Sequence, residues 1–247
     1  MGKNTVIIDT FSSPTKIEFT SEFNVAVPFI DRHLEEGRRE KIIIHSTSGE
    51  KVTYGQLFER VNKSGNVLKS IGLDSGDRIL MMVKDSPEFF YLFWGAIKAG
   101  FIPVPLNTLF RCNDYSYIIE DSECAAVFYS PEFKTEVESA LAQVSSSPDH
   151  SCLTEGVSGS FLEQLQSASL ELDPVPASAT DDCFWLYSSG TTGKPKGVVH
   201  SHRDMVVTSQ HYGIETLGVR EEDVCFSAAK LFFAYGLGNA MTFPLWS

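Results

Sequence analysis

The sequence predicts a doubly wound α/β fold in which mostly parallel sheets carry flanking helices on both faces. We expect a strand over residues 78–83, because Arg78 is followed by a continuous apolar run, which is typical of a strand buried inside a parallel sheet. Ser86 and Pro87 begin a helix that we expect to end at Gly100, and residues 101–106 form the next short strand. Alternation of strands and helices at this spacing indicates the α/β class.

In the N-terminal part of the chain, turn and capping residues again mark the ends of the expected strands and helices. Residues 41–45 and 51–53 are β-rich and flank a polar turn, so we expect a pair of strands there. Thr53 and Gln56 have the spacing of a capping box, in which each side chain bonds the backbone N–H of the other residue. The helix that they begin should end at Gly72.

The alternation of strands and helices continues toward the middle of the chain. We expect a helix over residues 113–121, a strand over 124–129 and a further helix that begins at Pro131. Residues 145–182 are rich in serine and proline, and we expect a surface excursion with one short helix at 161–167. We expect a strand directly after this excursion, leading into the segment at residues 187–197.

Composition narrows the class of protein. The chain has 247 residues, of which 43% are hydrophobic, and its net charge is −12. An acidic globular protein of this kind is not expected to have nucleic acid or an anionic membrane as its main partner. The five cysteines show no Cys-x-x-Cys spacing, and no signal-peptide pattern is apparent. We therefore expect a cytoplasmic protein without disulfides or a metal site.

The segment at residues 187–197 reads Tyr-Ser-Ser-Gly-Thr-Thr-Gly-Lys-Pro-Lys-Gly and follows an apolar run. Glycines let the backbone wrap closely around an anion, while hydroxyls, backbone N–H groups and lysines bind phosphate oxygens. The segment is not a Walker loop, because Pro195 stands where the second glycine would be. It is not a nucleophile elbow either, because Tyr187 replaces the first glycine of that motif. The alternatives are a polyphosphate-binding loop and a flexible loop without a ligand.

The pattern Ser-Ser-Gly-Thr-Thr-Gly-x-Pro-Lys-Gly resembles the phosphate loop of the adenylate-forming superfamily, which includes acyl- and aryl-CoA ligases, luciferases and peptide-synthetase adenylation domains. Residues 53–57 and 96–107 resemble two further segments of that superfamily. The resemblance implies an incomplete large N-terminal, AMP-binding domain without the C-terminal lid domain. One α/β subdomain that carries the phosphate loop would span about 75–215, and parts of a second would lie at about 1–72 and 222–247.

The resemblance also implies a reaction with ATP, Mg²⁺ and coenzyme A. A carboxylate attacks the α-phosphate of ATP to give an acyl-adenylate, and the thiol of coenzyme A then displaces AMP. Lys194 occupies a variable position, and no catalytic residue or metal ligand is assigned in this part of the enzyme. The residues that would bind the ATP phosphates are Ser188, Ser189, Gly190, Thr191, Thr192, Gly193 and Lys196.

Residues 230–245 resemble a segment of benzoate-CoA ligases. In the adenylate-forming superfamily this position forms a wall of the acid pocket and of the coenzyme A channel. Here the implied pocket residues are Phe233, Ala234, Tyr235 and Gly236. Aromatic side chains on either side of a small alanine favour a planar aromatic acid. The alternative is ordinary core packing, which needs no ligand. No aspartate near this segment marks an amino-acid ammonium site, which disfavours a peptide-synthetase domain.

The sequence thus predicts the N-terminal half of an ATP-dependent aryl-CoA ligase that acts on a small-molecule carboxylic acid of benzoate type. Other acids remain open, namely 2-aminobenzoate, a hydroxybenzoate or a medium-chain fatty acid, as does a non-catalytic nucleotide-binding fragment. The oligomeric state is open, with a homodimer among the options. We expect the 247 residues alone to be inactive, with a sheet strand around Trp246 left unpaired. His200 and His202 are expected to be structural rather than a metal pair.

Overall fold

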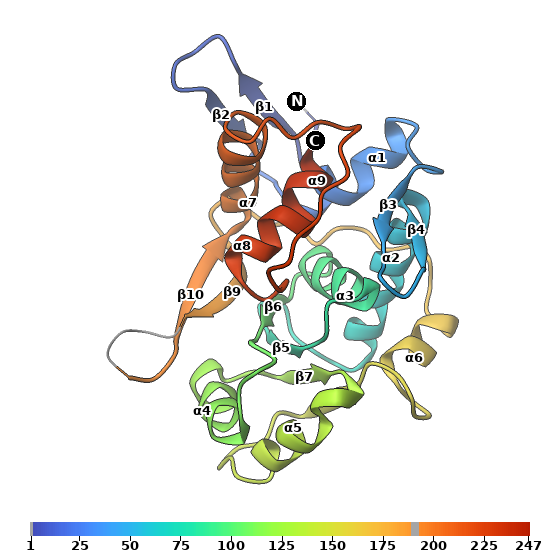
Figure 1. Ribbon diagram of the computed structural model, residues 1–247, viewed down its shortest axis with the longest axis vertical. Helices are drawn as coiled ribbons and strands as arrows, with labels where there is room; N and C mark the ends of the chain where they lie inside the picture. The colour runs from blue at the N-terminus through green and yellow to red at the C-terminus, as the bar shows by residue number, and fades with distance from the viewer. Residues whose placement is uncertain (1, 189–192) are drawn as a thin grey trace.

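A computed structural model of the protein describes residues 2–188 and 193–247. A parallel sheet in the order β6-β5-β7-β8 lies at its centre (Figure 1). Leu80 in the middle of this sheet lies opposite Val104 on one side and Val127 on the other. The four strands are β5(Arg78–Met82), β6(Ile102–Pro105), β7(Ala126–Tyr129) and β8(His150–Leu153).

Helices cover both faces of this sheet, as Figure 1 shows. They are α2(Tyr54–Ser70) and α3(Pro87–Lys98) on one face, and α4(Cys112–Ser122) and α5(Lys134–Leu141) on the other. Successive side chains of a strand point to opposite faces, and β5 follows this rule. Ile79 and Met81 pack with α2 and α3, whereas Leu80 and Met82 pack with α4 and α5. The predicted doubly wound arrangement is confirmed.

The helix ends lie where the sequence places them. The N–H of Gln56 donates to Oγ1 of Thr53 at 3.2 Å, and the N–H of Thr53 donates to Oε1 of Gln56 at 2.9 Å. Both bonds of the predicted capping box are therefore present. Gly72 and Gly100, just beyond the ends of α2 and α3, have φ angles of 83° and 86°. Glycine adopts this left-handed conformation without the steric cost that a Cβ would bring.

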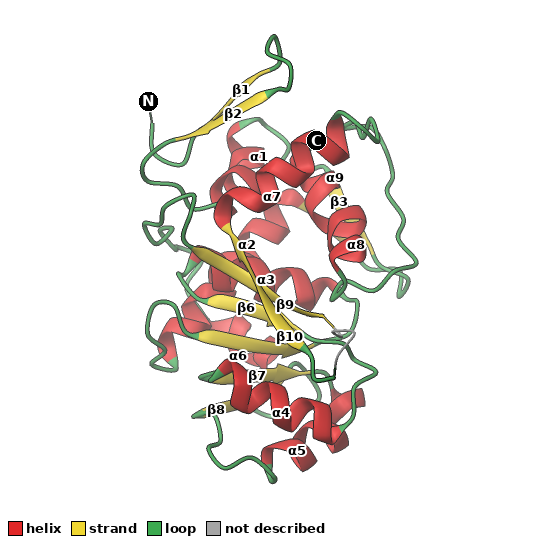
Figure 2. Cartoon of the chain, turned by 90° about the vertical axis from the view of Figure 1, so that its left-hand side faces the viewer, coloured by secondary structure: helices red, strands yellow, loops and turns green. Residues whose placement is uncertain are grey.

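Within the described residues, six further strands form three antiparallel pairs. The last of these pairs along the chain lies next to the parallel sheet. In that pair β9 packs beside β6, so the hairpin continues the layer of strands (Figure 2). The sequence patterns predict β3, β4 and β9, but not β1, β2 or β10. The pairs are β1(Val6–Asp9) with β2(Lys16–Phe19), β3(Ile42–His45) with β4(Lys51–Thr53), and β9(Asp182–Ser188) with β10(Lys196–Ser201).

The excursion at residues 145–182 contains the predicted helix α6(Phe161–Ser167), but it also contains β8, which corrects the expectation of loops around a single helix. In the part of the chain that the structure describes, β8 pairs only with β7, which makes it an edge strand. Its four residues, His-Ser-Cys-Leu, are half-buried or exposed, so they lack the continuous apolar pattern that reveals the central strands.

The expectation of a strand around Trp246 is wrong, because this residue lies in a short terminal helix, α9(Phe243–Trp246). Its side chain is buried and packs on Phe29, with ring centroids 5.1 Å apart, and its indole N–H donates to Oε1 of Gln210 at 3.0 Å.

No helix among the described residues is long and apolar enough to cross a membrane. The other short helical segments are η1(Val27–Asp31), α1(Arg32–Glu35), η2(Pro131–Phe133), α7(His202–Thr208), η3(Ser209–Ile214), α8(Ala234–Leu237), η4(Gly238–Thr242) and α9(Phe243–Trp246).

Candidate active site

The hairpin of β9 and β10 positions the two ends of the predicted phosphate loop. Ser188 is the last residue of β9 and Lys196 the first of β10, and the two lie opposite each other in the ladder. Both side chains are exposed. Gly193 has a φ angle of 136°, which side-chain-bearing residues rarely adopt. The remaining predicted phosphate ligands, Ser189, Gly190, Thr191 and Thr192, lie outside the described residues.

A pocket with a volume of about 390 Å³ lies at the loop end of this hairpin. It brings Ser188 together with Phe233 and Ala234 of the predicted acid pocket. Tyr235 and Gly236 do not line it, and the Tyr235 side chain is 67% exposed. The pocket is formed by Asn107, Phe110, Leu186, Tyr187, Ser188, Val198, His200, Phe232, Phe233 and Ala234.

The acid-pocket segment folds as a tight turn followed by α8. The N–H of Phe233 donates to the carbonyl of Lys230 at 3.1 Å, and the N–H of Leu237 donates to the carbonyl of Phe233 at 2.8 Å. A Cβ on Gly236 would lie 2.1 Å from the carbonyl oxygen of Lys230. Only glycine fits this close backbone approach, so Gly236 shapes the pocket wall by its packing rather than by lining the cavity.

Asp85 fixes the same turn to the parallel sheet. Its Oδ1 accepts the N–H of Leu231 at 3.2 Å, and its Oδ2 lies 3.5 Å from Nζ of Lys230. Asp85 follows β5 at the carboxyl end of the sheet, where ligands of open α/β sheets bind. Asp85 was not predicted from the sequence, although its place after a buried apolar strand is a signal that could have identified it.

His200 also belongs to the pocket and was not predicted there. Its ring stacks on Phe184, with centroids 4.6 Å apart and an interplanar angle of 9°. Burial lowers the pKa of His200, which favours a neutral ring at pH 7. Asn107 and Phe110 are further pocket residues that the sequence analysis misses. Asn107 lies two residues beyond the end of β6, so its position after a parallel strand was again an available signal.

His202 has a structural role, as the sequence analysis expects. Its buried ring accepts the N–H of Val25 at Nδ1, over 3.2 Å, and burial lowers its pKa to about 4. His200 and His202 line different pockets. Elsewhere in residues 2–188 and 193–247, no three His, Cys, Asp or Glu side chains gather in a metal-binding group.

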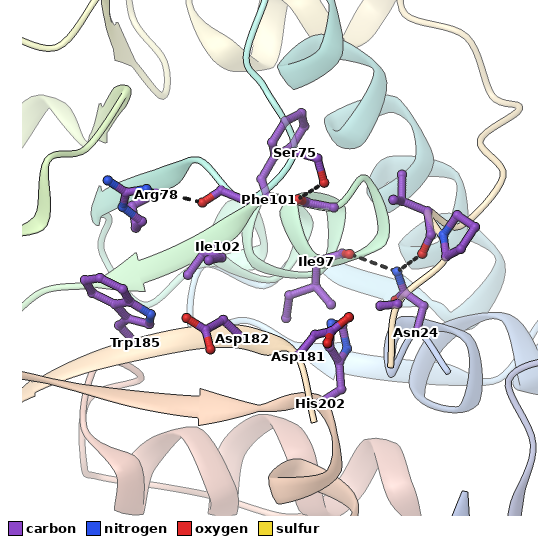
Figure 3. Close-up of a pocket in the computed structure, with 15 residues that line it drawn as sticks. Asn24, Ser75, Arg78, Ile97, Phe101, Ile102, Asp181, Asp182, Trp185 and His202 are labelled. Atoms are coloured by element: carbon purple, nitrogen blue, oxygen red, sulfur yellow. Dashed lines mark hydrogen bonds between the residues drawn. The ribbon is translucent and has the colours of Figure 1, made fainter. Parts of the chain in front are cut away.

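A second pocket, of about 410 Å³, contains His202 and lies at the opposite end of β9 (Figure 3). Ile102 and Asp182, which begin β6 and β9, line it together with Trp185. The Asn24 amide on its wall donates to the carbonyl of Ile97 at 3.1 Å. Because this pocket lies at the amino ends of the strands, it is separate from the pocket beside Ser188.

Comparisons with known proteins agree on one family. Residues 30–247 match the model of the family described as AMP-binding enzyme. The chain is 40% identical over 241 residues to the benzoate–CoA ligase of Thauera aromatica, covering 97% of this chain and 45% of that protein. It is 42% identical over 230 residues to the 4-hydroxybenzoate–CoA/benzoate–CoA ligase of Rhodopseudomonas palustris, covering 91% of this chain and 42% of that protein.

The structure is similar to solved structures as well. The crystal structure of a benzoate CoA ligase from Burkholderia xenovorans LB400 superposes with a TM-score of 0.82 at 36% sequence identity, covering 90% of this chain and 43% of that one. The chain therefore spans a little under half the length of the curated relatives that it matches.

Proposed function

Because the chain belongs to the AMP-binding enzyme family, we propose that it supplies the ATP-phosphate site and the acid pocket of an aryl-CoA ligase. The complete reaction joins an aromatic carboxylic acid of benzoate type to coenzyme A through an acyl-adenylate. The division into subdomains at about 75–215, 1–72 and 222–247 is part of this proposal, and a homodimeric state and a cytoplasmic location stay predictions.

The observation that carries the proposal is a single pocket lined by both predicted sites. Ser188 lies at the start of the phosphate loop, and Phe233 and Ala234 belong to the acid segment. Adenylation requires the acid carboxylate to lie against the α-phosphate of ATP, since positioning supplies much of the rate enhancement in such a step. Contiguous binding sites for the two substrates meet this requirement.

The roles of the loop residues follow from charge. Acid and ATP are both anions, so their approach needs cationic and N–H or O–H donor groups more than it needs a general base. Lys196 would supply a positive charge, and Ser188 a hydroxyl donor, to the β- and γ-phosphates. We propose that Mg²⁺ would accompany the ATP phosphates and neutralise part of their charge. Coenzyme A would reach the acid along the exposed side of Phe233.

The pocket favours an aromatic acid. Phe232 and Phe233, with ring centroids 4.3 Å apart, and Phe110 give it aromatic walls, and Ala234 leaves space between them. A planar ring that packs against such walls gains about 1 kcal/mol of binding free energy in addition to the gain from the area that it buries. Benzoate is the acid that we propose, with 2-aminobenzoate, a hydroxybenzoate and a medium-chain fatty acid as the alternatives.

The direct test is calorimetric titration of the 247-residue chain with ATP and Mg²⁺. Wild-type chain should bind, and Lys196→Ala should weaken binding about tenfold, because one charge-assisted contact to phosphate is lost. Lys134→Ala, which removes an exposed lysine from α5, is the matched control and should leave the affinity unchanged. Equal affinity of wild type and Lys196→Ala would contradict the assignment of the loop.

A further inference from the structure

We propose that Asp121 is a positioning residue for the phosphate-binding loop, which it holds through Tyr187. This inference rests on the proposed function, since it concerns the same loop. Tyr187 is the residue before Ser188 on β9, whereas Asp121 lies near the end of α4, on another layer of the fold. The two are 66 residues apart in the sequence.

The Asp121 carboxylate uses both of its oxygens on tyrosines from different elements. Oδ2 accepts the hydroxyl of Tyr187 at 2.7 Å, and Oδ1 accepts the hydroxyl of Tyr117 at 3.0 Å. Hydrogen bonds to an ionised carboxylate are shorter and stronger than neutral ones. Burial, and then the bond to Asp121, raise the pKa of Tyr187, so its hydroxyl remains a donor throughout the physiological range.

Tyr187 in turn contacts both strands of the hairpin. It lies opposite Gly197 in the β9–β10 ladder, and a Cβ on Gly197 would come within 3.3 Å of Cζ of the Tyr187 ring. The ring therefore lies across the strand that leaves the loop, while its hydroxyl reaches α4. One carboxylate on α4 thus fixes the strand that enters the loop and, through the ring, the strand that leaves it.

Lys194 adds a second contact between the loop and the same helix. Its Nζ lies 4.5 Å from the centre of the Tyr117 ring, within the range of a cation–π interaction. Tyr117 is also the second tyrosine bound to Asp121. α4 therefore contacts the segment at Tyr187 and at Lys194, and six of the seven predicted phosphate ligands lie between these two residues in the sequence.

Such a support matters for nucleotide binding because a loop that is ordered before binding loses less conformational freedom when the ligand arrives. Tyr187→Phe removes the hydroxyl that binds Asp121 and keeps the aromatic ring that lines the pocket, so a loss of ATP affinity would report on the lost support. We expect Tyr187→Phe and Asp121→Leu each to raise the dissociation constant for ATP and Mg²⁺ by about fivefold, the scale of one intramolecular hydrogen bond.

The chain offers a matched control in Tyr129, whose hydroxyl donates to Oε1 of Glu138 at 3.3 Å in the same core but away from the loop. Tyr129→Phe removes a bond of the same kind and should leave ATP affinity unchanged. The Tyr187→Phe/Asp121→Leu double variant should bind ATP no more weakly than Asp121→Leu alone, because the Asp121 change already breaks the bond to Tyr187.

The measurement is calorimetric titration of all five chains with ATP and Mg²⁺, at a temperature where circular dichroism shows each one folded. A specific loss of affinity in the Tyr187 and Asp121 variants supports the inference. If Tyr187→Phe binds ATP as tightly as wild type, or if Tyr129→Phe loses as much affinity, Asp121 does not position the loop, and the proposed function stands. If wild-type chain binds no ATP, the proposed function fails and takes this inference with it.

Discussion

The backbone N–H of Leu231 donates a hydrogen bond of 3.2 Å to the carboxylate of Asp85, which lies 146 residues earlier in the chain. This bond ties the turn before α8 to the carboxyl end of β5, in the central sheet. The position of Phe233 and Ala234 in the pocket therefore depends on a residue that does not line that pocket itself.

Asp85→Ala should loosen the pocket wall. The change removes both the acceptor for Leu231 and the ion pair with Lys230, and loss of a hydrogen bond to a charged group costs about 1–3 kcal/mol. Hydrogen exchange of the Leu231 amide should accelerate accordingly. Asp85→Asn keeps the acceptor and is the control that should retain most of the protection. Unchanged exchange in Asp85→Ala would show that the bond does not hold the turn.

Whether Gly236→Ala raises or lowers the stability of the chain tests how tightly the backbone packs in this pocket wall. In an ordinary helix, replacing glycine by alanine stabilises a protein by about 1 kcal/mol. Here the new Cβ would lie 2.1 Å from the Lys230 carbonyl oxygen, so the turn must shift, and overpacking of this kind costs about 1–3 kcal/mol. Urea unfolding should therefore show a less stable variant. A variant more stable than wild type would mean that the backbone approach is not as close as the structure has it.

Lys98 is a fully buried cation whose removal should be costly. Its Nζ donates to Oδ1 of Asp31 and, at 2.8 Å, to Oδ1 of Asn62. Lys98→Met leaves the Asp31 carboxylate buried without its partner, which costs about 3–5 kcal/mol. The Lys98→Met/Asp31→Leu double variant should recover part of the loss because it removes the unpaired charge. Urea unfolding measures the stability of each variant. A loss of unfolding free energy below about 1 kcal/mol in Lys98→Met would contradict a buried ion pair.

His33 should make the stability of the chain fall in mild acid. Its Nε2 donates to the carbonyl of Leu245 at 2.9 Å, and its Nδ1 accepts from Arg38 at 2.8 Å. Burial, followed by the charges of Arg32 and Arg38, lowers its pKa from 6.5 to about 3. The unfolded state therefore binds a proton near pH 6.5 that the folded state binds only near pH 3. The free energy of unfolding should decrease as the pH falls through this window.

The size of the effect follows from linkage. A single group of this kind removes about 2 kcal/mol between pH 6.5 and 4.5. His33→Gln keeps an amide donor for Leu245 but does not titrate, so the stability of this variant should fall less steeply over the same range. His202 titrates in both proteins and cancels from the comparison. Parallel pH profiles for wild type and His33→Gln would contradict a buried neutral His33.

Local signals in the sequence predict much of the fold. These signals act through hydrogen bonds or backbone angles within a few residues, so they can be recognised in the sequence alone. They are Thr53 with Gln56, the proline at the start of α3, and the glycines that follow α2 and α3. β8 and β10 are harder, because edge and hairpin strands with exposed side chains lack a continuous apolar pattern. Trp246 shows the opposite error, since an apolar segment alone does not distinguish a buried helical turn from a strand.

The candidate site was predicted unevenly for the same reason. Its motifs are contiguous in the sequence, so Ser188, Lys196, Phe233 and Ala234 could be named from it. His200, Asn107 and Asp85 join them only through the tertiary fold, from other strands or from the ends of other strands. Asp121 and Tyr187 are 66 residues apart, and no local pattern shows that they meet.

The central claim is that phosphate and aromatic-acid sites share one pocket, and binding of a hydrolysis-resistant benzoyl-adenylate analogue tests it most directly. Burial of the phenyl ring should make the analogue bind the chain about 30-fold more tightly than AMP, on the scale of about 2 kcal/mol for an aromatic side chain. Ala234→Leu should abolish this gain by filling the pocket, while its affinity for AMP stays that of wild type. Equal affinities of wild-type chain for the analogue and for AMP would contradict the account.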